Sequence, residues 1–242
     1  MASSLRQLDN EIWDSELRFK QGLLRMRVRM TVLRLPSGGL LLYSPIRIDE
    51  DLARELAELG PVEHIVAPSC LHDLHSGAAK RRYPDAKLWG APGLAARRPD
   101  LAFDAVLGEA PAEWSNSIEC LLLQGIPRIN EVVFYHTSSR TLVCADFLFN
   151  IQDEASTLTR LFWRMFGVWR RLTLSRVFKW MIKDRGAFSR CVARILAWDV
   201  QRISMGHGDV VPDAQAKLRV ALQGFAGALE LTAGAALDKG SA

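Results

Sequence analysis

The sequence has few cysteines and no pair of them at the spacing of a metal or redox motif. Cys70, Cys120, Cys144 and Cys191 lie far apart, and none belongs to a C-x-x-C motif. Three of them lie inside apolar runs, where a small buried thiol is common. This pattern argues against a disulfide-stapled scaffold and indicates a reducing compartment.

Long hydrophobic runs are absent as well. No run approaches the roughly 18 apolar residues of a membrane-spanning helix, and the first residues, M-A-S-S-L-R-Q-L-D-N-E-I-W, lack the apolar core of a secretory signal. The formal net charge is +4, most bases are spread along the chain, and no nucleic-acid motif is present. We therefore expect a cytoplasmic protein with no nucleic-acid partner.

What the sequence does contain is enough apolar material for a large core. Its 242 residues are 49% hydrophobic and 24% charged, which is typical of a globular protein. The order of strand-like and helix-like patterns indicates a layered α/β fold. We expect one domain over residues 1–242, with a helical insert at about 155–185 and a disordered tail at about 231–242.

The first third of the chain alternates strands with helices. Residues 25–34, R-M-R-V-R-M-T-V-L-R, alternate basic and apolar side chains, which predicts a strand with one wet face. The turn P-S-G-G joins it to the strand L-L-L-Y as a hairpin. Asp49 can cap the start of a helix that ends at Gly60, and the buried strand V-E-H-I-V-A-P follows.

The same patterns place the later elements. A short basic helix starts at Gly77. Further strands are predicted at 86–90, 101–107, 118–123, 131–136, 141–145 and 202–205, and further helices at 155–184, 187–198 and 213–229.

Three of the strand-like runs end in side chains that can bind a metal or move a proton. Cys70, His72, Asp73 and His75 follow the first run, Asp146 the second, and His207 and Asp209 the third. Strand ends in an α/β fold meet at one edge, so these residues can form one site. Imidazole, thiolate and carboxylate groups suit one divalent ion, zinc before iron or manganese. The alternative is that no cofactor is bound.

Each candidate also has a structural explanation. The two histidines of the first run could lie at the surface or cap a helix, and Asp146 could cap a turn. His207 lies between two glycines, where the backbone can turn and aim the imidazole inward. The remaining histidines, His64 and His136, lie inside a strand and at a hairpin end, where we expect packing roles.

These residues and their order resemble the metallo-β-lactamase superfamily, whose fold is an αββα sandwich. More closely, four segments are similar to the domain of unknown function numbered 4336: A-P-S-C-L-H-D-L-H, Y-P-D-A-K-L-W-G-A-P-G-L, N-E-V-V-F-Y-H-T-S-S-R-T-L-V-C-A-D-F-L-F-N and W-D-V-Q-R-I-S-M-G-H-G-D. The resemblance covers about residues 13–222. It implies the fold and leaves the substrate open.

The superfamily's metal pattern is H-x-H-x-D-H, then a lone histidine, a bridging aspartate and a final histidine. The resemblance places Cys70, His72, Leu74 and His75 on the first motif, Asp146 on the bridging position and His207 on the last. Leu74 departs from this pattern, and no histidine occurs between Gly125 and Glu131, where the lone one is expected. What remains is one ion held by His75, His207 and Asp146, with His72 or Cys70 as a fourth ligand or an outer partner.

Two functions follow from this comparison. The first is a metal-dependent hydrolase with a degenerate site, acting on a small ester, thioester or lactone through metal-bound hydroxide. Asp73 or Asp209 would accept a proton. The second is a non-catalytic pseudo-hydrolase that serves as a binding or membrane-associated protein.

The helical insert carries a separate signal. Between Ala155 and Arg185, Arg and Lys alternate with Trp and Phe at helical spacing. We expect this segment to pack over the site as a lid with its bases solvated. Peripheral contact with a membrane is the alternative, because interfacial helices show the same composition.

Overall fold

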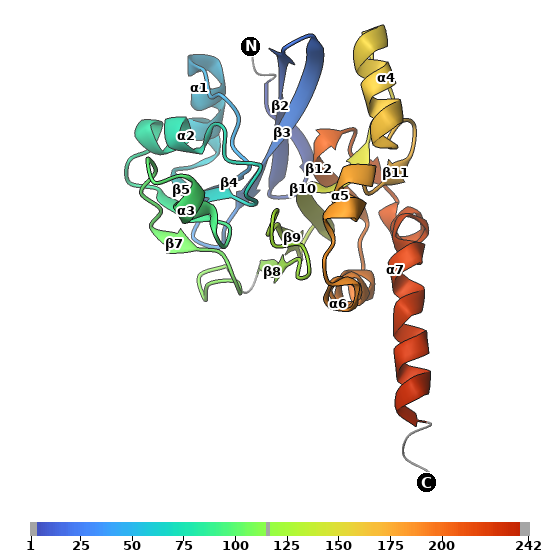
Figure 1. Cartoon of the computed structure of the whole chain (residues 1–242). Coiled ribbons are helices and arrows are strands. Elements are labelled where there is room, and N and C mark those ends of the chain that lie inside the picture. The colour runs from blue at the N-terminus through green and yellow to red at the C-terminus, as the bar shows by residue number, and fades with distance from the viewer. Residues whose placement is uncertain (1–3, 115–116, 238–242) are drawn as a thin grey trace.

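The computed structural model describes residues 4–114 and 117–237, and side chains as far as Phe225. Two β-sheets pack face to face, and helices cover the outer face of each (Figure 1). The fold is an αββα sandwich, as the sequence predicted.

The first sheet contains seven strands within the described residues, hydrogen-bonded in sequence order. They are β1 (Arg6–Asp9), β2 (Ile12–Gln21), β3 (Leu24–Arg34), β4 (Leu40–Tyr43), β5 (Val62–Ala67), β6 (Lys87–Gly90) and β7 (Ala105–Val106). The strands from β1 to β4 are antiparallel to their neighbours, and those from β4 to β7 are parallel. A parallel order requires crossovers, and the three connections from β4 to β7 contain α1, α2 and α3.

The second sheet has the order β13-β12-β10-β9-β8, with β11 paired to β10. Its strands are β8 (Ile118–Leu122), β9 (Val132–His136), β10 (Thr141–Asn150), β11 (Leu172–Thr173), β12 (Arg202–Gly208) and β13 (Val211–Pro212). β10 and β12 run parallel at the centre. Asp146 lies in the middle of β10, and His207 lies near the carboxyl end of β12.

The helices divide between the two outer faces (Figure 1). On the first sheet lie α1 (Glu50–Leu59), α2 (Ser76–Arg82) and α3 (Leu94–Arg97), and on the side of the second lie α4 (Thr157–Phe166), α5 (Arg176–Met181), α6 (Arg185–Ala197) and α7 (Ala214–Leu237). Strand alternation explains this arrangement. In β10, Val143 and Ala145 face the core between the sheets, whereas Leu142 and Cys144 join the core beneath the helices.

Most elements lie where the sequence predicted them, and the differences have local causes. Asp49 caps α1 by accepting a hydrogen bond from Leu52 N–H, as expected. The predicted hairpin is β3 and β4, but the sequence patterns did not reveal β1 and β2 before it. The segment 155–184 is not one helix, because Gly167, at φ +79°, ends α4 in the left-handed conformation. The chain then turns into β11 before α5 begins.

The C-terminal helix is also longer than predicted. It continues through Thr232 to Leu237, within the range expected to be a tail. Residues 238–242 of that range lie outside the described part of the chain.

The prediction that one face of β3 is exposed to water is wrong at Arg29. The Arg29 side chain is only 2% exposed and makes an ion pair with Asp14 on β2, with 2.7 Å between Nε and Oδ2. It also pairs with Glu16. Its Nη1 donates to the carbonyl oxygen of Met205 on β12, 3.0 Å away. At Arg29 the basic face is therefore sealed by acids of the neighbouring strand and connects the two sheets, whereas Arg25 near the start of β3 is exposed.

Removing this guanidinium should destabilise the protein strongly. Arg29→Met removes the buried partner of Asp14 and leaves only its pair with the more exposed Arg6, so we expect a loss of about 3 kcal/mol in the free energy of unfolding. Arg25→Met, on the same strand but exposed, is the matched control and should change stability by less than about 0.5 kcal/mol. Urea denaturation at pH 7 measures both. Equal effects of the two substitutions would contradict a sealed ion-pair network.

Candidate metal centre

Three side chains from separate parts of the chain converge between the sheets. His72 lies in the loop after β5, Asp146 lies in β10 and His207 in β12. The two Nε2 atoms are 3.3 Å apart, and Asp146 Oδ1 is 3.4 Å from His72 Nε2 and 3.5 Å from His207 Nε2. Within the described residues this is the one group of His, Cys, Asp or Glu found close enough to hold a metal ion.

An irregularity in β10 brings Asp146 to this position. Cys144 pairs with Met205 and Phe149 with His207, so the intervening part of β10 is longer than that of β12 and bulges. Glu131 stabilises the bulge from behind. Its buried carboxylate accepts hydrogen bonds from the backbone N–H of Ala145, at 2.7 Å, and of Asp146, at 3.0 Å.

Hydrogen bonds to the far ring nitrogens orient both imidazoles. His207 Nδ1 donates to the carbonyl oxygen of Arg27, 2.9 Å away, so the Nε2 lone pair is free to face Asp146. The ring of Phe149 stacks on this imidazole, with centroids 5.4 Å apart. His72 Nδ1 is 2.8 Å from the hydroxyl of Ser44. Such outer partners fix the ring orientation of histidine ligands.

Glycines on either side of His207 make room for the close approach. A Cβ at Gly206 would lie 2.7 Å from Cε1 of His72 and 2.9 Å from the carbonyl oxygen of Ala145. Gly208 has φ +106°, and a Cβ at this position would clash with the carbonyl of Asn150. The G-H-G sequence therefore serves packing against His72 and the bulge as well as turning the chain.

The three groups hold complementary charge states. Burial lowers the pKa of His207 to about 4, which keeps its imidazole neutral. Burial alone would raise the pKa of Asp146, but the charge and hydrogen bond of His72, with His207, hold it below its ordinary value. Burial opposes protonation of His72, yet Asp146 raises its pKa overall. The group thus contains an ionised carboxylate facing two imidazoles.

The triangle of donor atoms fits one divalent ion. Bonds of 2.0–2.1 Å in a tetrahedral site place ligand atoms about 3.3–3.4 Å apart. The three observed distances, 3.3, 3.4 and 3.5 Å, match this edge length. Two imidazoles and one carboxylate could therefore coordinate one ion and leave a fourth position open.

A cavity of about 340 Å³ opens beside the group, with His72 and His207 in its wall. The other sequence candidates lie around it. His75 lines the cavity and stands at the N-terminus of α2, and Asp73 lines it while paired with Arg98. Neither joins the close group.

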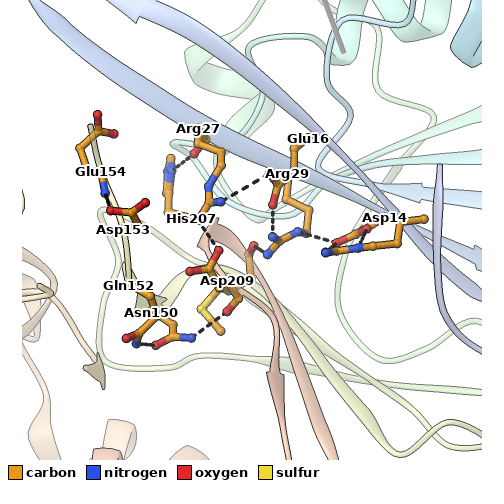
Figure 2. Close-up of polar contacts among 12 residues, drawn as sticks. Asp14, Glu16, Arg27, Arg29, Asn150, Gln152, Asp153, Glu154, His207 and Asp209 are labelled. Carbon is orange, nitrogen blue, oxygen red and sulfur yellow. Dashed lines mark hydrogen bonds and ion pairs between the residues drawn. The ribbon is translucent and has the colours of Figure 1, made fainter. Parts of the chain in front are cut away.

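Two further candidates are engaged elsewhere. Cys70 Sγ lies 3.6 Å from the carbonyl oxygen of Pro92, as a weak donor. Asp209 makes an ion pair with Arg27, with 2.6 Å between Oδ1 and Nη2. The backbone carbonyl of the same arginine orients His207, so Asp209 supports the centre from outside (Figure 2).

Sequence reasoning missed the residues that support the centre from behind. Ion pairs run from Asp209 through Arg27, Glu16 and Arg29 to Asp14 (Figure 2). The acids of W-D-S-E at the start of β2, read against R-V-R in β3, could have revealed this network. Glu131 gave no such signal, because an acid at a strand end is common.

Comparison with known families places the chain. Residues 9–164, more than half of the sequence, match the family model described as a domain of unknown function, DUF4336. The chain belongs to the DUF4336 family. The matched DUF4336 residues include His72 and Asp146, and His207 lies beyond them. No protein with a curated description matches the sequence.

Solved structures share the DUF4336 protein's fold. A metallo-β-lactamase from Pontibacter korlensis superposes with a TM-score of 0.62 at 11% identity, covering 92% of this chain and 98% of its own. The metallo-β-lactamase FIM-1 from Pseudomonas aeruginosa, in its mono-zinc form, gives 0.63 at 11% identity, with 93% and 95% covered. One from Hirschia baltica gives 0.62 at 11%, with 91% and 96% covered. At these identities the likeness shows the fold, which is that of metallo-β-lactamases.

The buried carboxylate of Glu131 predicts a pH effect on stability. Burial, with repulsion from Asp146, raises its pKa to about 7, from an ordinary value of 4.5. The folded protein therefore keeps a proton that the unfolded chain has lost. Between those two values, stability falls as pH rises, by at most about 1.4 kcal/mol per pH unit.

Glu131→Gln isolates this contribution in metal-free protein, because glutamine has no proton to lose. The wild type should lose stability relative to Glu131→Gln from pH 4.5 to 7, measured by urea denaturation across that range. Glu109→Gln, an exposed acid, is the control and should give a flat difference. A flat difference for Glu131→Gln would contradict a proton on this carboxyl group.

Proposed function

We propose that this DUF4336 protein is a metal-dependent hydrolase of a small ester, thioester or lactone. The observation that carries the proposal is the triangle of donor atoms from His72, Asp146 and His207, whose sides match a tetrahedral metal site. The fold supports it, since one of the similar structures is a metallo-β-lactamase in a mono-zinc form.

Within the proposed centre, each residue has a defined part. His207 presents Nε2 because its Nδ1–H is donated to Arg27, and His72 is oriented through Ser44. Asp146 supplies one negative charge. A divalent ion, when bound, polarises a carbonyl oxygen and lowers the pKa of a coordinated water toward about 7. Zinc suits this donor set, and so does ferrous iron, for which two histidines and one carboxylate are a common site.

The adjoining cavity bounds the substrate. Apolar side chains form much of its wall, among them Phe19, Met26, Ile46 and Leu71, so an acyl or ring portion of modest size fits better than a charged group. At about 340 Å³ the cavity is at the small end of ligand sites. Asp73 is the carboxylate in its wall and the proton acceptor we propose.

Metal content tests the proposal directly. Protein purified without chelators or affinity metal should contain about one equivalent of zinc, iron or manganese. His72→Ala and His207→Ala should each lower this content below about 0.1 equivalent, because two ligands hold an ion weakly. His75→Ala is the matched control, since this histidine lines the same cavity outside the triad, and it should retain the metal. Circular dichroism confirms that each variant is folded.

The outcome separates the two functions considered from the sequence. Metal that is lost with the triad, together with hydrolysis of a p-nitrophenyl ester, a thioester or a γ-lactone that requires the metal, would support the hydrolase. Metal content that survives His207→Ala would contradict the triad as the site. A folded wild type that neither contains nor takes up metal would identify a non-catalytic binding protein.

The close packing at Gly206 gives an independent prediction. Gly206→Ala places a methyl group against the ring of His72, so we expect metal affinity to fall about 10–100-fold, as for loss of an outer partner. Gly224→Ala, where a Cβ meets open space, is the control and should leave affinity unchanged. Competition with a chromophoric chelator measures both. Equal affinities would show that His72 does not ligate.

A further inference from the structure

Positive charge is concentrated in one segment of this chain. Residues 155–185 contain eight of the 31 Arg and Lys residues and one of the 27 acids. The other 211 residues therefore carry 23 bases and 26 acids. A net charge of +4 for the whole chain conceals a segment of +7 beside a remainder of −3.

The bases of this segment are not neutralised by the fold. None of the eight forms an ion pair with an acid in the part of the chain that the structure describes. Several instead donate to backbone carbonyls or lie over aromatic rings, as Lys183 lies over Trp180. Burial, with repulsion from Arg171 and Arg176, lowers the pKa of Lys179. The segment presents uncompensated positive charge to the surroundings.

An apolar stripe lies next to these charges on α4. Leu158, Leu161 and Met165 are 47%, 53% and 67% exposed. They are spaced by three and four residues and so share one side of the helix. The inner side is turned toward the core through Trp163, whose ring lies 6.1 Å from that of His207. The stripe therefore takes no part in the packing that covers the candidate metal centre.

The neighbouring elements extend the same surface. On α5, Val177 is 38% and Trp180 68% exposed, and Arg176 donates to the carbonyl oxygen of Met165 at the end of α4. The β2–β3 hairpin, with Leu23 85% exposed at its tip, is hydrogen-bonded to α4 through Thr159. In Figure 1 the hairpin and α4 project toward the same end of the molecule.

We propose that this α4–α5 surface, made of the exposed apolar residues 158, 161, 165, 177 and 180 and the bases of 155–185, binds peripherally to anionic lipid membranes. On α4, Arg160 and Arg164 lie along one edge of the apolar stripe. This places bases at headgroup level when Leu and Met side chains enter the acyl boundary. No helix among the described residues is long and apolar enough to cross a membrane, so the contact is interfacial.

Lipid fits this surface better than nucleic acid does. Single-stranded nucleic acids are bound in a basic groove where aromatic rings stack on bases. Here most of the aromatic rings of α4 face inward, and aliphatic side chains form the exposed stripe. Exposed aliphatic groups beside Arg and Lys side chains that lack an acidic partner are complementary to acyl chains beneath anionic headgroups.

Vesicle flotation tests the proposal on the full chain. The protein should float with vesicles of phosphatidylcholine containing about 30% phosphatidylglycerol and not with phosphatidylcholine alone. Arg164→Gln/Lys179→Gln/Lys183→Gln should weaken the partition on the order of 100-fold, since each base near an anionic surface contributes about fivefold. Arg54→Gln/Arg81→Gln/Arg128→Gln removes the same charge elsewhere and is the matched control.

A second variant tests the apolar half of the surface. Leu158→Ser/Leu161→Ser/Met165→Ser alters exposed side chains and should lower flotation at least tenfold, whereas Val106→Ser/Val220→Ser, two exposed apolar residues elsewhere, should not. Equal flotation of the α4–α5 variants and their controls would overturn the proposal. Failure of the wild type to float with the anionic vesicles would also overturn it, as would binding to single-stranded RNA without binding to vesicles. The metal content of these variants should equal that of the wild type, so this proposal and the hydrolase proposal can fail separately.

Discussion

The guanidinium of Arg29 is the contact on which the centre of this fold depends. It lies on β3, satisfies two acids of β2, and reaches across the sandwich to the backbone of β12 at Met205, two residues before His207. Two residues earlier in β3, Arg27 repeats the arrangement with Asp209 and orients the imidazole of His207. Buried ion pairs contribute little net stability but fix which groups face each other. Here they set the register between the sheets at the level of the candidate metal centre.

The fold was largely predictable because local sequence signals mark most of its elements. Asp49, Gly60 and the turn before β4 mark their own boundaries, and apolar runs mark the buried strands. The failures occurred where tertiary contacts decide. Alternating bases in β3 indicate a solvated face only if no acids lie opposite, and the acids of β2 belong to a strand that its own sequence pattern did not reveal.

The candidate site was predictable in part for the same reason. His72 follows β5, and Asp146 and His207 lie in the neighbouring parallel strands β10 and β12, so their convergence follows from topology. Which histidine of the first motif takes part depends on geometry that spacing does not give: His72 turns toward β12, whereas His75 begins α2. Glu131 was missed because its role is to bind backbone N–H groups of a bulge, and a bulge is set by register rather than by sequence period.

The origin of the three converging residues has a mechanical consequence. His72 extends from the first sheet, Asp146 and His207 belong to the second, and the carbonyl that orients His207 returns to the first. An ion held by these groups would act as a non-covalent cross-link between the halves of the sandwich. Binding of the ion would then stabilise the packing of the two sheets by a free energy that rises with the logarithm of ion concentration. Separation of the sheets, even with each sheet intact, would release it.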